Sequence, residues 1–242
     1  MSFSGKAAVP MTQAVEEILG DRTSGGMVVT KTNHGGPTRR VAVRVAQHPV
    51  PDKAGVDAGR RILHVAHQAG ADDLVIALIS GGSALLVVPA EDISLADLQA
   101  MTGALLACGA TINEINCLRK HCSAVKGGQL ARATAPATLL TLVLSDVVGS
   151  PLDVIGSGPP CPTPAPGPMP GPSWSAMGWR THCRTPLSPV CADAGLAGDL
   201  PDTPKPNDPA FARSRTVVIA DNRVAALAAL AKARKAGSTH NC

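Results

Sequence analysis

The chain has 242 residues, an apolar fraction of 45% and a formal charge of +4, so it is long enough to bury one large core or two smaller ones. Its basic residues are scattered and only 2% of its residues are aromatic, which argues against a nucleic-acid surface made of a basic run or of stacked rings. Seven cysteines without a CxxC pair indicate neither a disulfide framework nor a zinc site.

Targeting signals are not recognisable in the sequence. The first residues lack the basic and apolar blocks of a signal peptide, and no apolar run is long enough to cross a bilayer. We therefore expect a cytoplasmic protein that binds neither membrane nor nucleic acid.

The first quarter of the chain predicts helices alternating with short strands. Residues 6–19 carry apolar side chains at helical spacing, and we expect this helix to have no strand before it. The stretches MVVT, residues 27–30, and RVAVRVA, residues 40–46, are typical of strands. Asp52 can then cap a helix over residues 54–69.

The middle of the chain predicts two buried strands with helices between them. The strands are LVIALI, residues 74–79, and TLLTLVL, residues 138–144. Ser94 and Asp97 can open an amphipathic helix as a capping box, with Asp where Glu or Gln is usual. Residues 111–133 predict a further helix that is broken by a Gly-Gly pair. Strands that alternate with helices indicate an α/β fold with a mostly parallel sheet.

A proline-rich segment interrupts this pattern. Residues 159–198 have no apolar period and contain both tryptophans, so one interpretation is a linker of polyproline type. Regular structure is expected to return within residues 199–242, as a strand RTVVIA followed by an alanine-rich helix. We therefore divide the chain into an α/β domain over residues 1–158, an irregular segment, and a continuation of the same domain.

Polar residues follow three of the predicted strands. They are Ser80 to Ser83, Ser145-Asp146 and Asp221-Asn222. In open parallel sheets ligands bind beyond the carboxyl ends of the strands, so these residues are candidates for one site. The Ser-Gly-Gly-Ser loop is either a simple turn or an anion-binding loop.

The charged candidates also leave alternatives open. Asp146, at the end of a buried strand, is a general base, a magnesium ligand or a helix cap. The cations Arg119, Lys120 and Lys126 either neutralise an anionic substrate or form a solvated helix face. Lys6 lies at the start of the first helix, where it either attracts an anion or is an ordinary exposed lysine.

Several longer motifs together resemble the class II glycerate kinases, the glycerate 2-kinase family of DUF4147 and MOFRL type, whose members are also labelled hydroxypyruvate reductase. The resemblance covers residues 5–159 and 198–236 in the family's order. The motifs are HPVPDKAG, LISGGSALL, NEINCLRKHCSAVKGGQLA, LVLSDVVGSPLDVIGSGP and TPKPNDPAFARSRTVVIADN.

This resemblance implies ATP-dependent phosphoryl transfer to D-glycerate, with Mg²⁺, giving 2-phosphoglycerate. It implies a Rossmann-like domain followed by a small C-terminal domain, and it allows a homodimer. Lys6 and Asp146 are the implied catalytic residues, with Asp146 also a candidate for holding Mg²⁺. The implied phosphate-binding residues are Ser80, Gly81, Gly82, Ser83, Asp221 and Asn222, and the implied substrate-binding residues are Arg119, Lys120, Ser123 and Lys126.

The sequence also departs from the family's pattern. The family's loop usually carries three glycines, and one of them is missing between Ser80 and Ser83. The proline-rich segment replaces a helix-forming one, and we hypothesise that it is translated out of frame. The small C-terminal domain is expected to be missing.

Two other functions remain as alternatives. Reduction of hydroxypyruvate with NAD(P)H would agree with the family's older label, but the sequence carries no GxGxxG turn followed by an acidic residue. The other alternative is a non-catalytic fragment that keeps only a ligand-binding or subunit-contact surface.

Overall fold

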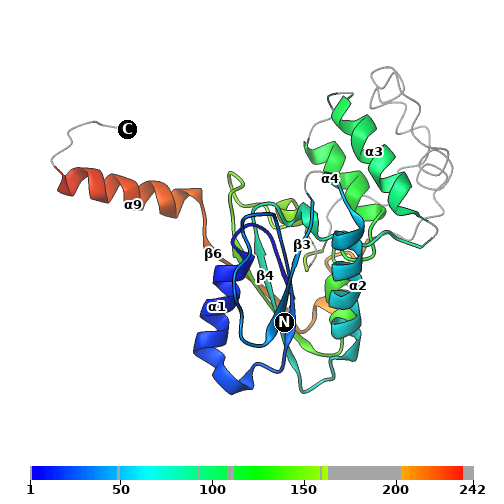
Figure 1. Ribbon diagram of the computed structural model, residues 1–242, viewed down its shortest axis with the longest axis horizontal. Coiled ribbons are helices and arrows are strands. Elements are labelled where there is room, and N and C mark those ends of the chain that lie inside the picture. Colours follow the sequence, from blue (N-terminus) through cyan, green and yellow to red (C-terminus); the bar gives the residue numbers. More distant parts are fainter. Residues whose placement is uncertain are drawn as a thin grey trace.

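Helices cover a parallel sheet in the computed structural model (Figure 1). The residues that it describes are 2–47, 50–91, 93–107, 109, 112–158, 160–162 and 203–236. Within them the strands are β1 (Ser2–Ser4), β2 (Gly26–Thr30), β3 (Val41–Val45), β4 (Leu74–Ser80), β5 (Thr138–Leu144) and β6 (Ser214–Ala220). The α-helices are α1 (Ala8–Leu19), α2 (Lys53–Gln68), α3 (Leu95–Ala107), α4 (Ile112–His121), α5 (Gln129–Thr134) and α9 (Asn222–Lys235).

The strand order is β3-β2-β1-β4-β5-β6, and every neighbouring pair is parallel. This is the order of a Rossmann sheet, in which the chain reverses its direction of winding between β1 and β4. The predicted α/β class with a mostly parallel sheet is confirmed. A crevice for ligands is expected where the winding reverses, beyond the carboxyl ends of β1 and β4.

The expectation that no strand precedes the first helix is wrong. Strand β1 lies in the middle of the sheet, where Phe3 is in register with Val28 of β2 and Leu78 of β4. Its sequence, SFS, is short and polar, so it carries no apolar strand signal. The burial of Ser4 is possible because its hydroxyl donates to the carbonyl of Ser83, 3.2 Å away, a partner that the sequence cannot reveal.

The two faces of the sheet are covered by different helices. Alternate residues of β4 show this, because Ile76 packs with Val9 of α1 whereas Ala77 packs with Ile62 of α2. Helix α5 joins α2 on its face. Helices α3 and α4 form a separate apolar cluster around Met101, beyond the sheet (Figure 1).

The predicted caps are confirmed, and so is the predicted break before residue 129, but the helix before that break is shorter than expected. Asp52 accepts the amide of Gly55 at 2.9 Å, and the Ser94 and Asp97 side chains bond reciprocally at the start of α3. The helical segment expected over residues 111–133 divides into α4 and α5 as the Gly-Gly pair predicts, but α4 already ends at His121. It ends there because the Ser123 hydroxyl accepts nearby backbone amides, which forms a turn in place of a helical one.

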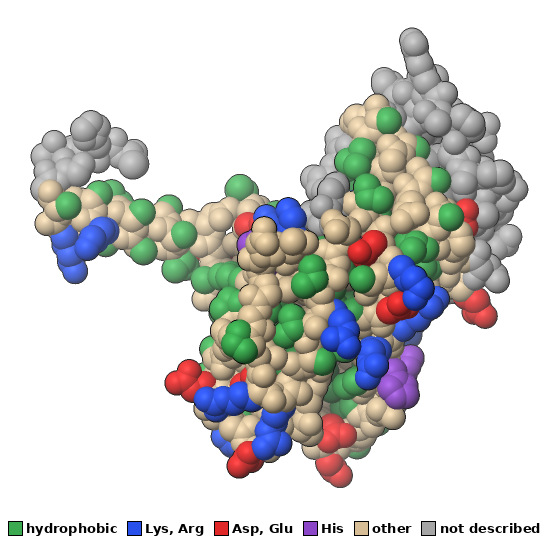
Figure 2. Space-filling model, viewed as in Figure 1, with side chains coloured by type: hydrophobic (Ala, Val, Ile, Leu, Met, Phe, Trp, Pro, Cys, Tyr) green, Lys and Arg blue, Asp and Glu red, His purple; other side chains and the backbone are tan. Residues whose placement is uncertain are grey.

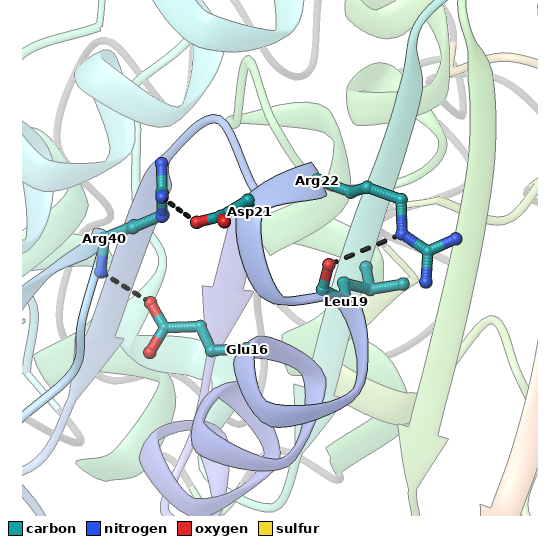
Figure 3. A network of polar contacts seen from close by, with 5 residues as sticks. All are labelled: Glu16, Leu19, Asp21, Arg22 and Arg40. Carbon is teal, nitrogen blue, oxygen red and sulfur yellow. Dashed lines mark hydrogen bonds and ion pairs between the residues drawn. The ribbon is translucent and has the colours of Figure 1, made fainter.

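Two carboxylates, Glu16 and Asp21, hold the start of β3, at the end of the sheet where its parallel strands begin (Figure 3). Glu16 is 3% exposed and accepts the backbone amides of Arg39, Arg40 and Val41 at 2.8, 2.8 and 3.0 Å. Burial raises the pKa of this carboxyl, but the three amides outweigh burial and hold the pKa below its usual value. Asp21 adds an exposed ion pair with Arg40.

The last described elements are poorly covered. Strand β6 pairs with β5, but Ile219 is 49% exposed, and α9 has no buried residue and extends away from the body (Figures 1 and 2). Nearly all of the proline-rich segment, and with it the out-of-frame hypothesis, lies outside the described residues. None of the helices in the described ranges is both long and apolar enough to cross a membrane.

Candidate functional site

A pocket of about 210 Å³ lies beyond the carboxyl end of β4. Its walls come from the loop after β4, from Asp146 and Val147 after β5, from α4, and from residues 154–157. It therefore lies at the edge of the sheet where the strand order predicts a ligand crevice.

The β4 loop is a tight turn that is held from inside. The hydroxyl of Ser83 points at the carbonyls of Ser80 and Ser4, 2.6 and 2.7 Å away, and Gly82 takes the left-handed conformation with φ +84°. A single 3₁₀ turn, Ser83–Leu85, follows the loop. The loop therefore gains no dipole from a long helix, and any anion bound here depends on side chains for its counter-charge.

Lys6 and Asp146 approach this loop from the strands on its two sides, because β1 and β5 are the neighbours of β4. A β-carbon on Gly81 would collide with the Asp146 carboxylate, and one on Gly82 would lie 3.5 Å from Cγ of Lys6. Each glycine thus lets a functional side chain lie against the loop. Both side chains are exposed, and neither has a hydrogen-bond or ion-pair partner among the described residues.

Helix α4 supplies a buried wall on the other side of the pocket. Asn116 is 6% exposed, and its Oδ1 accepts the hydroxyl of Ser157 at 3.0 Å. Arg119 lies one turn further along the helix and also lines the pocket. Burial lowers the pKa of the Arg119 guanidinium, and no residue that the structure describes forms a hydrogen bond or ion pair with it.

Lys126 connects the β4 loop to the loop at residues 155–158. The residue is 2% exposed, and its ammonium lies 3.0 Å from the Gly156 carbonyl and 3.5 Å from that of Ser83. The amides of Gly127 and Gly128 donate to the carbonyls of Ser157 and Gly158 at 3.0 and 2.9 Å. Residues 126–128 are therefore hydrogen-bonded in register to residues 156–158. Burial, with a smaller contribution from the Arg119 charge, lowers the pKa of Lys126 to about 7.

Arg119 and Lys126 also line a second, smaller cavity of about 30 Å³. Its other walls are apolar side chains of α3, such as Met101, together with Ser123. This volume suffices for one or two water molecules. Arg119 belongs to the linings of both cavities.

The other predicted site residues have partners of their own. Lys120 is 4% exposed, lines neither cavity and lies 3.1 Å from Asp153. Asp221 accepts the amide of Val224 and so caps α9, whereas Asn222 donates to the backbone carbonyl of Asp146 at 2.9 Å. The structure thus brings Asn222 to the site but gives Asp221 a capping role.

Sequence reasoning missed Asn116 and Ser157. The signal available for Asn116 was its spacing, because residues three apart on a helix share a face and Arg119 had been identified. Ser157 gave no such signal, since its place in the pocket depends on the conformation of a glycine-rich loop.

The donor set suits Mg²⁺ carried by a phosphate. No group of three carboxylate, imidazole or thiol side chains gathers within the described ranges. Asp146 is the one described carboxylate in the pocket lining. Mg²⁺ commonly binds through one or two carboxylates together with substrate phosphates and water, and an exposed carboxylate without a protein donor can take that role.

Residues 3–167 match the model of a family described as a domain of unknown function, DUF4147. The D-glycerate 2-kinase of Thermotoga maritima is 48% identical over 160 residues, which are 65% of this chain and 38% of that protein. A protein of Agrobacterium vitis with the provisional name hydroxypyruvate reductase is 48% identical over 157 residues, 64% of this chain and 36% of its own length.

A solved structure also resembles this chain. The crystal structure of Thermotoga maritima glycerate kinase superposes with a TM-score of 0.81 at 36% identity, covering 98% of this chain and 55% of that one. The chain spans 36 to 41% of the length of the first curated relatives it matches.

Proposed function

The chain belongs to the DUF4147 family, and from this membership we propose that its pocket serves a glycerate 2-kinase reaction, the transfer of a phosphoryl group from ATP to D-glycerate. One observation carries the proposal. An exposed lysine and an exposed aspartate meet at a glycine loop, and neither has a described partner. Phosphoryl transfer needs charge neutralisation and an oriented hydroxyl more than a covalent intermediate, and these two groups supply both.

The residues divide the reaction between them. The 2-hydroxyl oxygen of glycerate attacks the γ-phosphorus of ATP, its proton passes to the Asp146 carboxylate, and the bond from phosphorus to the β–γ bridging oxygen breaks to release ADP. The Lys6 ammonium neutralises the phosphate oxygens. Arg119 binds the glycerate carboxylate from the opposite wall. The product is 2-phosphoglycerate.

Asp146 would also hold Mg²⁺ together with the ATP phosphates, and the ion would supply further neutralisation of their charge. The β4 loop, residues 80–83, lies beneath the phosphates, and Asn222 steadies the backbone of Asp146. Lys126 holds the β4 loop against the loop at Gly156. We assign Lys120 to its ion pair with Asp153 and not to the substrate.

Hydroxypyruvate reduction is the second candidate, because a relative carries that name. Dinucleotides bind Rossmann sheets through free amides at the first strand-to-helix turn. Here the amide of Lys6 donates to the Gly81 carbonyl at 2.9 Å, and that of Ala7 donates to the Ser80 hydroxyl at 3.0 Å. Since these amides are engaged, the turn favours a kinase over a reductase.

An assay of ADP release with D-glycerate, ATP and Mg²⁺ tests the proposal, with NADPH oxidation on hydroxypyruvate as its counterpart. We expect ADP release that requires D-glycerate and that disappears in Asp146→Asn. NADPH oxidation without ADP release would support the reductase. Silence in both assays, from a folded chain, would support the non-catalytic alternative.

A further inference from the structure

We propose that Asn116 recognises the carboxylate of the substrate. Its side-chain amide, oriented by Ser157, donates a hydrogen bond to the carboxylate of a short 2-hydroxy acid bound beside Arg119. The inference rests on the proposed function and extends it to a specificity-determining residue.

The Asn116 side chain has a hydrogen-bonded oxygen and an amide nitrogen without a described acceptor. Its Oδ1 accepts from Ser157, whereas no described residue accepts a hydrogen bond from its Nδ2. The side chain is 6% exposed and belongs to the pocket lining. Nδ2 is not one of the fully buried, unpartnered polar atoms of the described residues, so it keeps some exposure and can donate to a ligand in the pocket.

Ser157 fixes the direction in which the amide points. It has φ +61°, a conformation that side chains rarely adopt, and it stands between two glycines that also have positive φ. Its carbonyl accepts the amide of Gly127 at 3.0 Å, which holds the backbone in place. A glycine would adopt this conformation without strain. The serine is strained here, and what it contributes in exchange is its hydroxyl.

The chemistry of this wall suits a carboxylate. Asn116 and Arg119 lie three residues apart on α4, close enough for their donors to reach the two oxygens of one carboxylate. One neutral and one cationic donor match a single negative charge, whereas the exposed Lys6 and the glycine loop lie on the phosphate side. The pocket, of about 210 Å³, has room for a short hydroxy acid.

The first test replaces Asn116 with aspartate, which keeps the shape and the bond from Ser157 but repels a carboxylate. We expect the KM for D-glycerate to rise about 100-fold or more while the KM for ATP changes less than about threefold. The exposed Gln13 on α1, whose amide donates to the Pro37 carbonyl, provides a matched amide-to-acid control, Gln13→Glu, that should change neither value. An unchanged KM for D-glycerate in Asn116→Asp would overturn the inference.

A second pair of variants separates the hydroxyl of Ser157 from its backbone strain. Ser157→Gly and Ser157→Ala both remove the hydroxyl, but only alanine keeps a side chain at φ +61°. Both should raise the KM for D-glycerate by a similar factor, about 10-fold, while Ser157→Gly melts at the higher temperature. A rise in Ser157→Ala alone would show that backbone strain is responsible and would reject the orienting role.

Binding without ATP separates this inference from the proposed function. Calorimetric titration of the 242-residue chain with D-glycerate and with glycerol should show binding of the acid only, and Asn116→Asp should abolish it. Binding that depends on Asn116, without any turnover, would reject the kinase and keep the acid-reading role. Equal binding of glycerol, or none of D-glycerate, would overturn the inference.

Discussion

The two walls of the pocket differ in burial and in hydrogen bonding. On the loop wall, Asp146 is exposed and lies against Gly81, and the exposed Lys6 lies against Gly82 of the same loop, outside the pocket lining; neither side chain has a described partner. On the helix wall, Asn116 is almost fully buried and bonded to Ser157, and Lys126, which lines the second cavity, is buried and bonded to the two loops. An exposed charged group pays little desolvation penalty on folding and can stabilise charge that develops in a reaction. A buried, hydrogen-bonded group is held in one geometry. We conclude that the helix wall positions the acid and the loop wall performs the transfer.

Asp146→Asn should have the largest effect on activity. The amide cannot accept the hydroxyl proton, so we expect kcat to fall by about 10³-fold. Because the carboxylate is exposed and unpartnered, the free energy of unfolding should change by less than about 0.5 kcal/mol. Steady-state kinetics and urea unfolding measure the two quantities.

The exposed Asp57 on α2, which pairs with Lys53, provides the matched control. Asp57→Asn should leave kcat unchanged. A large loss of stability in Asp146→Asn would contradict the assignment of this wall to chemistry alone.

Gly81→Ala should have the next largest effect, because the new methyl group would displace the Asp146 carboxylate. A shift of about 1 Å lowers a rate by about 100-fold, so we expect kcat to fall by that order. Gly103→Ala on α3 is the control, since a β-carbon there meets nothing within 4 Å, and it should stabilise the helix by about 0.5 to 1 kcal/mol. Equal kcat values for the two variants would show that the carboxylate needs no fixed position.

Lys126→Met tests the buried wall through pH. The folded protein holds the pKa of Lys126 at about 7, against about 10.5 for a free lysine, so between these values the unfolded chain binds more protons. Stability of the wild type therefore rises with pH across this window, by roughly 2 kcal/mol between pH 7 and pH 9. The variant lacks this contribution, so the difference in free energy of unfolding between wild type and variant should shift in favour of the wild type as pH rises.

The same variant should lower kcat about 10-fold at pH 7, because two loops of the pocket lose their connection. Urea unfolding at several pH values measures the stability difference. A difference that is constant from pH 6 to pH 9 would mean that Lys126 titrates as an ordinary exposed lysine.

Glu16→Gln should have the smallest effect on activity, since Glu16 binds the first residue of β3 whereas the pocket follows the last residue of β4. It should cost about 1 to 3 kcal/mol at pH 7, because charged hydrogen bonds to backbone amides are weakened. The folded pKa is lowered, so this stabilisation is complete above about pH 4.5 and is lost as pH falls through the folded value. The difference between wild type and variant should therefore shrink in acid, and a changed KM would contradict the separation of the two edges.

The sequence predicted the parts of this fold that depend on local pattern. Long apolar strands such as β4 and β5, and caps such as Asp52, follow from periodicity and from side-chain chemistry within a few residues. Strand β1 could not be predicted, because its buried residue Ser4 is bonded to a loop 79 residues away.

The candidate site was predictable to the same degree. The residues after β4 and β5 were found because strand ends converge in parallel sheets. Asn116 and Ser157 form a pair separated by 41 residues, and the division between α4 and α5 depends on local turn bonds that compete with a helical pattern. The pair depends on tertiary structure and the early end of α4 on side-chain bonds to the backbone, and periodicity shows neither.

The claim that the helix wall positions the acid and the loop wall performs the transfer is tested most directly by the dissociation constant of D-glycerate. It is measured by calorimetry without ATP in wild type, Asp146→Asn and Arg119→Gln. If the helix wall positions the acid, Asp146→Asn should bind within about threefold of the wild type, and Arg119→Gln should bind at least about 10-fold more weakly. A loss of affinity in Asp146→Asn as large as that in Arg119→Gln would contradict the account.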